Sequence, residues 1–126
     1  PVNPLLLLAV GGAAGVGAGL RYLLDTGVGR MLGTRFPWGI LVVNIIGSFT
    51  LGLVTGIVTS SELSLVLGTG LLGGFTTFST VMVDTWTLGE AGKRRAAWAN
   101  GLGTLLACVA AAGLGLLAGA AFTGHL

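Results

Sequence analysis

Two groups of polar residues interrupt a chain that is otherwise strongly apolar. Asn44 and Ser48 are four positions apart, which places them on one face of a helix, and the Asn amide has two N–H donors for an anion or a neighbouring helix. Residues 73–80 read Gly-Gly-Phe-Thr-Thr-Phe-Ser-Thr. If a helix breaks here, its free carbonyl groups can hold a cation and its free N–H groups an anion. The alternative is an unbroken helix whose Ser and Thr side chains bond to carbonyl groups one turn back.

Arg21, at the end of the first apolar run, is a third polar candidate. Its guanidinium either reaches the lipid headgroups or supplies a fixed positive charge that attracts anions to a vestibule. The first, second and fourth spans contain no carboxylate and Asp84 comes only at the far end of the third, so the sequence disfavours a proton-coupled cation pump. With one cysteine, one histidine and no clustered carboxylates, we expect neither a metal cluster nor an enzyme. We expect Cys108 to be a small buried residue and His125 to have no functional role.

The composition indicates that helices in a membrane position these residues. Of 126 residues, 53% are hydrophobic and 8% are charged, whereas roughly 25% of the residues in soluble domains are charged. Uncharged runs cover residues 1–20, 36–61, 63–83 and 96–126, and a membrane-spanning helix needs about 20 residues. These runs lack the alternation of β-barrel strands. We predict an all-α integral membrane protein with a single four-helix domain, spans at about 4–24, 37–60, 63–88 and 96–121, and a third helix broken near mid-membrane.

Small residues recur every four positions in three of these spans and predict close packing between helices. In lipid, such residues allow two helix backbones to approach closely. They are Gly11, Gly15 and Gly19 in the first span, Ser48, Gly52 and Gly56 in the second, and Ala99, Gly103, Ala107, Ala111, Gly115 and Gly119 in the fourth.

The basic residues predict the orientation in the membrane. All six Lys and Arg residues fall at or in the first and third connections, and none falls in the second. Because cytoplasmic loops are enriched in Lys and Arg, we predict that loops 21–36 and 88–95 are cytoplasmic and that both termini lie outside. Six basic residues are too few for a nucleic-acid-binding face.

Three sets of motifs together resemble one family of membrane proteins. They are Gly11-Gly12-x-x-Gly15 with Arg21-Tyr22, then Phe36-Pro37-Trp38-Gly39 with Val43-Asn44-x-x-Gly47-Ser48-Phe49, and then residues 73–80. In this order, and over three of the four expected helices, they resemble the small fluoride channels of the Fluc/CrcB family. The resemblance implies an antiparallel dimer with two narrow pores in the bacterial inner membrane, through which cytoplasmic fluoride leaves passively.

The resemblance also implies roles for individual residues. Arg21 would lie near a pore vestibule, Asn44 would donate to the fluoride ion and Phe78 would offer it a ring edge. The backbone carbonyl groups of Gly73 and Thr76 would join those of the partner subunit in holding a structural sodium ion at the dimer interface. The polar residues expected to complete the fluoride pore are Ser48, Thr77, Ser79 and Thr80.

The sequence departs from the family pattern at three positions. Val81 stands where the family commonly has a second Phe, and Val cannot present a ring edge. Trp98 and Leu102 stand where the fourth span usually carries a Tyr and a Ser, and Thr104 is expected to compensate in part.

The distribution of charge raises a hypothesis about the partner. A subunit that inserts in both orientations should have little Lys/Arg bias, yet here the split is six to zero. We therefore hypothesise a heterodimer with a related subunit of opposite bias, in which this chain is partly degenerate and one pore works. A non-conducting structural subunit and a small multidrug exporter are the alternatives. The exporter would need a carboxylate in the first span, and residues 5–20 have none.

Overall fold

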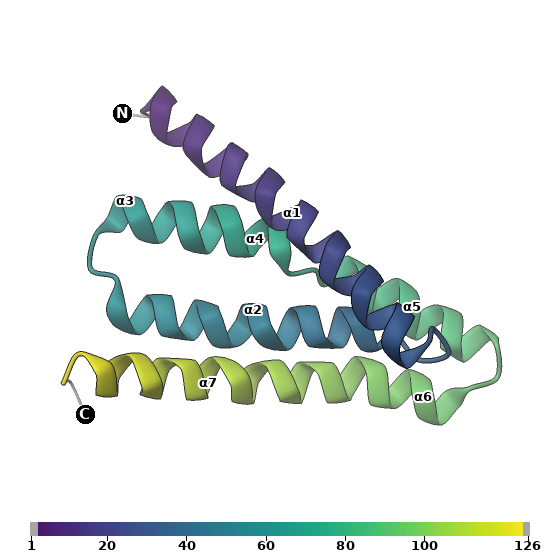
Figure 1. Cartoon of the computed structure of the whole chain (residues 1–126). Coiled ribbons are helices and arrows are strands. Elements are labelled where there is room, and N and C mark those ends of the chain that lie inside the picture. Colours follow the sequence, from purple (N-terminus) through teal and green to yellow (C-terminus); the bar gives the residue numbers. More distant parts are fainter. Residues whose placement is uncertain (1–2, 125–126) are drawn as a thin grey trace.

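The computed structural model describes residues 3–124, and they are helical almost throughout. Their helical segments join into four helices that are long and apolar enough to cross a membrane (Figure 1): Pro4–Leu32, Trp38–Ile57, Ser61–Glu90 and Arg94–Phe122. The prediction of an all-α chain with four apolar helices is confirmed.

The first helix, α1 (Pro4–Leu32), is longer than the predicted span, which ended at residue 24. Its start is capped by Asn3, whose Oδ1 accepts the N–H of Leu5 at 3.0 Å. No proline follows residue 24 until Pro37, and the helix ends before Gly33, whose φ of 82° lies in the left-handed region that glycine adopts without strain. Most of the predicted loop 21–36 is therefore helical, and the connection to the next helix is short.

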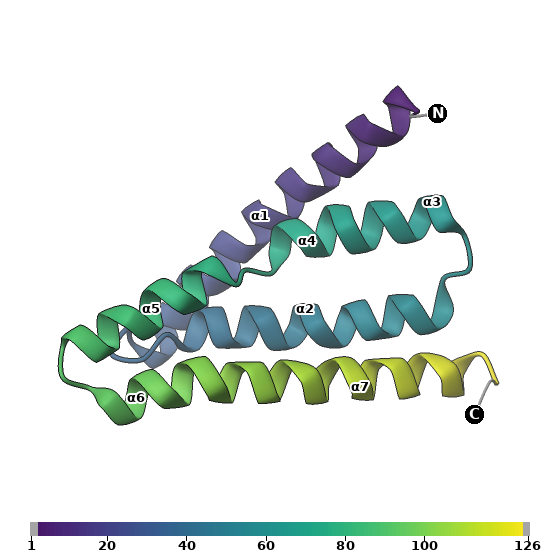
Figure 2. The ribbon, with the colours of Figure 1, turned by 180° about the vertical axis from the view of Figure 1, so that it is seen from behind.

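The second helix, α2 (Trp38–Ile57), packs along its length on α7 (Thr104–Phe122), as Figures 1 and 2 show. A Cβ on Gly52 would collide with the carbonyl of Ala112, and one on Gly115 would collide with the carbonyl of Phe49. Close backbone approach at the small residues of the second and fourth helices is confirmed here. Helix α2 ends three residues before the predicted position 60, because Ser60 caps the next helix by accepting the N–H of Leu63 at 3.3 Å.

Within residues 3–124, the small-residue stripe of the first helix does not pack against another helix. Gly11, Gly15 and Gly19 are exposed, and a Cβ on any of them would meet open space. Gly17 packs instead, because a Cβ there would collide with the carbonyl of Leu71. Helix α1 crosses the bundle obliquely, so that its N-terminal end stands away from the other helices (Figures 1 and 2).

The third long helix changes its winding and is interrupted once. It comprises α3 (Ser61–Ser64), the π-helix η1 (Leu65–Leu72), α4 (Gly73–Phe75) and α5 (Ser79–Glu90). Residues 76–78 are not helical, and Thr76 has an extended backbone with φ −82° and ψ 160°. The ribbon is visibly unwound between α4 and α5 in Figure 2.

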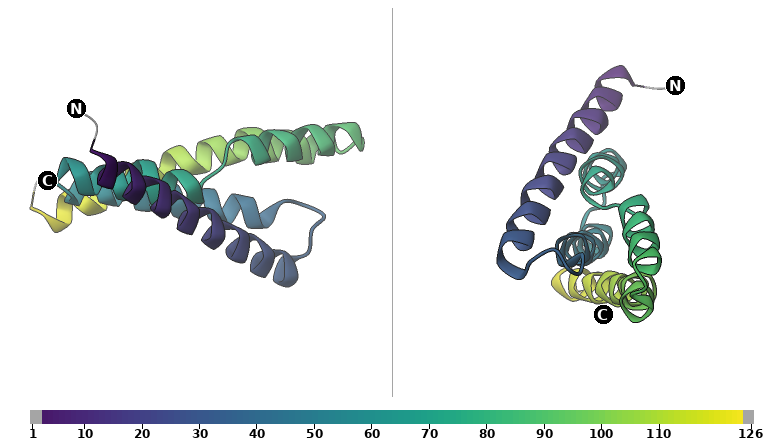
Figure 3. Two further views of the ribbon diagram at one scale, coloured as in Figure 1. Left: turned by 90° about the horizontal axis from the view of Figure 1, so that it is seen from above. Right: turned by 90° about the vertical axis from the view of Figure 1, so that its right-hand side faces the viewer.

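The fourth long helix also contains a π-helical stretch. It runs from α6 (Arg94–Trp98) through η2 (Ala99–Gly103) into α7. Because a π turn contains more residues than an α turn, it changes which side chains face a neighbouring helix, and such turns are frequent at functional sites. Seen along the bundle, α1 and α5 stand on opposite sides (Figure 3).

The basic residues lie mainly at one end of the bundle. Arg21 lies within α1, whereas the others lie where α1 and α5 end and α2 and α6 begin: Arg30, Arg35, Lys93, Arg94 and Arg95.

Two glycines of α7 test the contact between α2 and α7. Gly115→Ala should lower the stability by about 1–3 kcal/mol, the usual cost of overpacking, because its new methyl group meets the Phe49 carbonyl. Gly113→Ala is the matched control, since a Cβ there meets nothing within 4 Å and alanine favours a helix. Thermal unfolding in detergent measures both. Equal midpoints for the two variants would contradict the packing described here.

Candidate functional site

A cavity of about 220 Å³, here called the central cavity, lies where α2, the interruption and the fourth helix meet. It brings together four of the predicted pore residues: Asn44, Ser48, Thr77 and Phe78. The remaining residues that line it are Thr76, Val81, Met82, Gly101, Thr104, Leu105 and Cys108.

Asn44 is buried and stabilises residues 76–78, the interruption of the third long helix, through two reciprocal hydrogen bonds. Its Nδ2 donates to the carbonyl of Thr77 at 2.9 Å, and its Oδ1 accepts the N–H of Thr77 at 2.9 Å. The backbone of Thr77 thus bonds to a side chain from α2 and not to its own helix. Because the Asn amide has two N–H donors and these bonds use one, the second remains for the central cavity.

The hydroxyl groups of the interruption mostly serve the chain itself. Thr76 Oγ1 donates to the Leu72 carbonyl at 2.8 Å. Thr77 Oγ1 accepts the N–H of Thr80 at 3.2 Å and so satisfies one free donor at the start of α5. Thr77 Oγ1 also lies 3.1 Å from Thr80 Oγ1 and 3.3 Å from Ser79 Oγ. Of the hydroxyl residues predicted to line the pore, Ser79 and Thr80 do not line the central cavity.

Two side chains of the cavity wall differ sharply in exposure. Phe78 is 76% exposed, so its ring can contact a molecule bound at the open side of the cavity. Val81, three residues later, is buried. The position that departs from the family pattern is therefore packed inside the chain.

Thr104 is the cavity-lining polar residue whose hydroxyl group has no hydrogen-bond partner within residues 3–124. The residue is 5% exposed, and its Oγ1 is buried without a hydrogen-bond partner. Other helical threonines bond to the carbonyl one turn back, at 2.8 Å for Thr50, 2.8 Å for Thr55 and 2.7 Å for Thr85. A buried hydroxyl without a partner costs free energy, which a bound polar group in the cavity would recover.

Asn100 is a buried polar residue near the central cavity that the sequence analysis did not single out. It is 1% exposed, and its Nδ2 donates to the Val81 carbonyl at 3.2 Å and to Thr85 Oγ1 at 3.0 Å. Thr85 Oγ1 in turn donates to the Val81 carbonyl at 2.7 Å. This network fastens α5 to η2 just below the interruption. Polar residues at positions 100 and 104, one turn apart, are the sequence signal that would have found it.

Trp98 and Leu102, the expected fourth-helix pore positions, are placed elsewhere. Trp98 is 71% exposed, and both residues line an apolar pocket of about 270 Å³ with Thr85, Ala97 and Gly101. Asn100 and Thr104 take the inward face because each is two residues further along the helix. Cys108 corrects a further expectation, since its side chain is partly exposed and lines the central cavity.

Arg21 and the expected sodium ligands meet near the interruption. Arg21 Nη1 donates to the Thr76 carbonyl at 3.4 Å, which leaves that oxygen a second lone pair. Gly73 begins the short helix α4, and Gly73 and Thr76 line a second small cavity with Gly47 and Ser48. Carbonyl oxygens are hard ligands, so this donor set fits a hard cation such as sodium.

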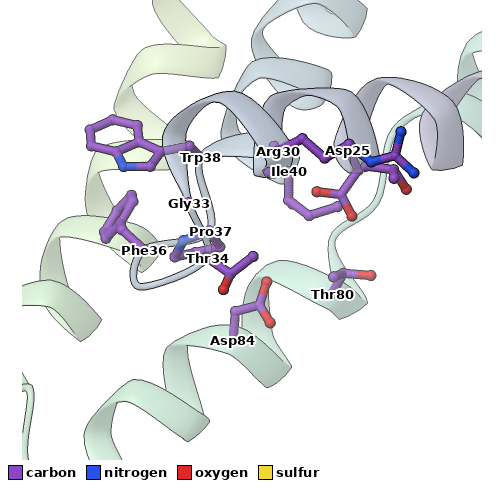
Figure 4. Close-up of a pocket in the computed structure, with 13 residues that line it drawn as sticks. Asp25, Arg30, Gly33, Thr34, Phe36, Pro37, Trp38, Ile40, Thr80 and Asp84 are labelled. Atoms are coloured by element: carbon purple, nitrogen blue, oxygen red, sulfur yellow. The ribbon is translucent and has the colours of Figure 1, made fainter.

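A larger cavity, the end cavity, opens at the basic end of the bundle (Figure 4). It has a volume of about 490 Å³ and is lined by Asp25 and Arg30 from α1 and by Thr80 and Asp84 from α5. The rings of Phe36 and Trp38 lie at its rim, with centroids 4.8 Å apart. Arg21 does not line it. His125 lies outside the described residues, and within residues 3–124 no three His, Cys, Asp or Glu side chains gather as a metal site.

The amino-acid sequence matches the family described as "CrcB-like protein, Camphor Resistance (CrcB)" over residues 6–116. A relative from Rubrobacter xylanophilus, named "Fluoride-specific ion channel FluC 1", is 48% identical over 121 residues, which cover 95% of each chain. A "Fluoride-specific ion channel FluC" from Chelativorans sp. is 46% identical over 117 residues, covering 89% of this chain and 92% of the relative. One from Geobacter sulfurreducens is 43% identical over 122 residues, covering 93% and 97%.

The resemblance that the motifs indicated is confirmed. The four apolar helices and the ion-channel relatives also establish a multi-pass membrane protein that is not an enzyme. With a match that extends from the first helix into the fourth, the chain belongs to the CrcB family.

Proposed function

We propose that this chain is a subunit of a fluoride-selective channel that lets cytoplasmic fluoride leave the cell passively. The observation that carries the proposal is the pair of unused donors in the central cavity. Within residues 3–124, the second N–H of Asn44 and the hydroxyl of Thr104 have no hydrogen-bond partner, and they come from two helices that pack closely together. Relatives named as fluoride-specific ion channels support the same conclusion.

The chemistry of the central cavity suits a small anion. Fluoride is strongly hydrated, so a narrow pore must replace its water with good hydrogen-bond donors. The Asn44 amide supplies one and the Thr104 hydroxyl another, while the edge of the Phe78 ring is electropositive. None of the residues that line the cavity carries a carboxylate. An anion there therefore meets donors and no negative side chain.

A structural sodium ion is the second part of the proposal. The carbonyl groups of Gly73 and Thr76, with those of a partner subunit, would hold it at the dimer interface. Bound there, the ion would supply a fixed positive charge beside the pore. Arg21, which contacts the Thr76 carbonyl, adds positive charge on the same side and would attract anions toward the pore entrance.

The proposed assembly is an antiparallel dimer in the inner membrane, with the basic end of each chain setting its orientation. Because five basic residues lie at one end, we propose that this chain inserts with that end in the cytoplasm and both termini outside. The charge bias and the buried Val81 favour a second candidate function, a partly degenerate structural subunit beside a related chain of opposite bias.

Fluoride efflux from liposomes tests these proposals directly. The purified chain alone should release fluoride and retain chloride, the control anion. Efflux that appears only when a related chain of opposite charge bias is added would support the structural subunit. Chloride release at a similar rate would contradict the proposed selectivity. If the folded protein released no fluoride either alone or with the related chain, the channel function would be contradicted.

Thr104→Val tests the unused hydroxyl. Valine has nearly the same shape but no donor, so fluoride efflux should fall roughly 10- to 100-fold, as expected for the loss of a hydrogen bond to a charged group. Thr55→Val is the matched control, because Thr55 is exposed and bonds to its own helix at 2.8 Å. Thr104→Val with full efflux and an unchanged unfolding midpoint would remove Thr104 from the pore.

Paired variants of the fourth helix decide which of its faces lines the pore. Asn100→Leu should lower the unfolding midpoint and the ratio of fluoride to chloride flux, because α5 loses its bond to η2. Leu102→Ser should change neither quantity, because Leu102 lines the separate apolar pocket. The opposite result, with Leu102→Ser raising fluoride flux, would restore the assignment made from the sequence.

A further inference from the structure

We propose that an anionic phospholipid binds between α5 and the fourth long helix. One acyl chain lies in the apolar pocket of about 270 Å³ beside Trp98, here called the lateral pocket, and the phosphate lies on Arg94 and Arg95. The lateral pocket shares only Gly101 with the lining of the central cavity, so this lipid site is distinct from the proposed fluoride path.

The first support is the chemistry of the lateral pocket, whose walls come from both helices. The Oγ1 of Thr85 is already bonded to the Val81 carbonyl and to the Asn100 amide, so the polar atom of this wall is used within the chain. A hydrocarbon chain suits the pocket because it asks for no hydrogen bond. The wall from α5 is Thr85, and the fourth helix supplies Ala97, Trp98, Gly101 and Leu102.

The second support is a pair of basic side chains beside this pocket. Arg94 and Arg95 begin α6, one helical turn before Trp98, and both are exposed. A guanidinium group fits a phosphate well, because it can donate two parallel N–H bonds to it. Residues 85–98 contain three basic residues and a single carboxylate, Glu90. Charge complementarity therefore favours an anionic lipid headgroup.

The order of residues along the fourth helix matches the layers of a lipid. Arg94, Trp98 and Leu102 follow one another at intervals of four residues, and the last two line the lateral pocket. A helix rises about 1.5 Å per residue, so roughly 12 Å of helix separates the first from the last. Tryptophan favours the interface between headgroups and hydrocarbon. Charge, interfacial ring and apolar side chain thus succeed one another in the same order as the parts of a phospholipid.

The other basic residues at this end of the bundle lie beside carboxylates. Arg30 lines the end cavity with Asp25, and Arg35 and Lys93 line a cavity of about 250 Å³ with Asp84. Neither of these cavities is lined by the two arginines at the start of α6. In the proposed orientation this end meets the cytoplasmic leaflet, whose surface is negatively charged.

A bound lipid would stabilise the contact between α5 and the fourth helix, because its chain touches both. Thr85 belongs both to the pocket wall and to the hydrogen-bond network of Asn100. A ligand that binds only the folded chain raises its stability. Phosphatidylglycerol should therefore raise the unfolding midpoint in detergent more than phosphatidylcholine does.

Quenching of tryptophan fluorescence by brominated lipids tests the site. Trp38→Phe with Trp86→Phe leaves Trp98, and Trp38→Phe with Trp98→Phe leaves Trp86 as the matched control, which is also 71% exposed but lies outside the pocket lining. Each chain is placed in phosphatidylcholine vesicles that contain a small share of phospholipid brominated in its upper acyl chain. Brominated phosphatidylglycerol should bind beside Trp98 roughly 5- to 30-fold more strongly than brominated phosphatidylcholine, as expected for one or two arginine contacts. Equal preference at both tryptophans would overturn the site.

Paired charge variants show whether the arginines of α6 hold the headgroup. Arg94→Gln with Arg95→Gln should abolish the preference for phosphatidylglycerol at Trp98. Arg30→Gln with Arg35→Gln is the matched control, because it removes two exposed charges from the same end of the bundle and should leave the preference intact. Equal loss in both pairs would mean a general attraction of surface charge and would overturn the site.

Two further outcomes decide what binds and what the result means for the channel. Displacement of the brominated lipid by excess inorganic phosphate, at matched ionic strength, would show a phosphate site that needs no acyl chain and would overturn the lipid assignment. The quenching measurement requires no fluoride flux. A chain that shows the lipid preference but no flux keeps the lipid site and loses the proposed function, whereas flux without the preference does the reverse.

Discussion

The reciprocal pair of hydrogen bonds between Asn44 and the backbone of Thr77 is the interaction on which the rest of the site depends. An interrupted helix in an apolar bundle leaves backbone groups without partners, and each of them is costly where water is excluded. Asn44 satisfies one N–H and one carbonyl of the same residue, at 2.9 Å each. The interruption is thereby a stable feature of the fold, and α5 can start in a new direction.

A second set of hydrogen bonds connects the start of α5, just after the interruption, to the fourth helix. Asn100 fastens α5 to the fourth helix through the Val81 carbonyl and Thr85 Oγ1. Both Asn side chains are buried and bond to backbone carbonyl groups, of Thr77 and Val81, and these bonds do not depend on which side chains stand at positions 77 and 81. This explains how Val can stand at position 81 without loosening the cavity wall: the wall is held by its backbone, and the small side chain packs inside.

The sequence predicted the helices and half of the site, and the reasons for the misses are local. Long apolar runs specify helices, and the spacing of Asn44 and Ser48 specifies one face, so both predictions needed no tertiary information. On the fourth helix the sequence analysis considered Trp98 and Leu102, whereas Asn100 and Thr104, two residues further along, are the buried positions. The face of α1 that packs within the chain depends on where η1 crosses it. Gly17 lies at that contact, whereas Gly11, Gly15 and Gly19 do not.

The interruption at residues 76–78 also has an electrical consequence. Helix α4 ends there and α5 begins there, so the negative end of one helix dipole and the positive end of another meet within three residues. The short segment is therefore bipolar: one side is favourable to a cation and the other to an anion, through peptide groups alone. Since these partial charges do not titrate, the polarity of the segment stays the same over the whole pH range in which the protein remains folded.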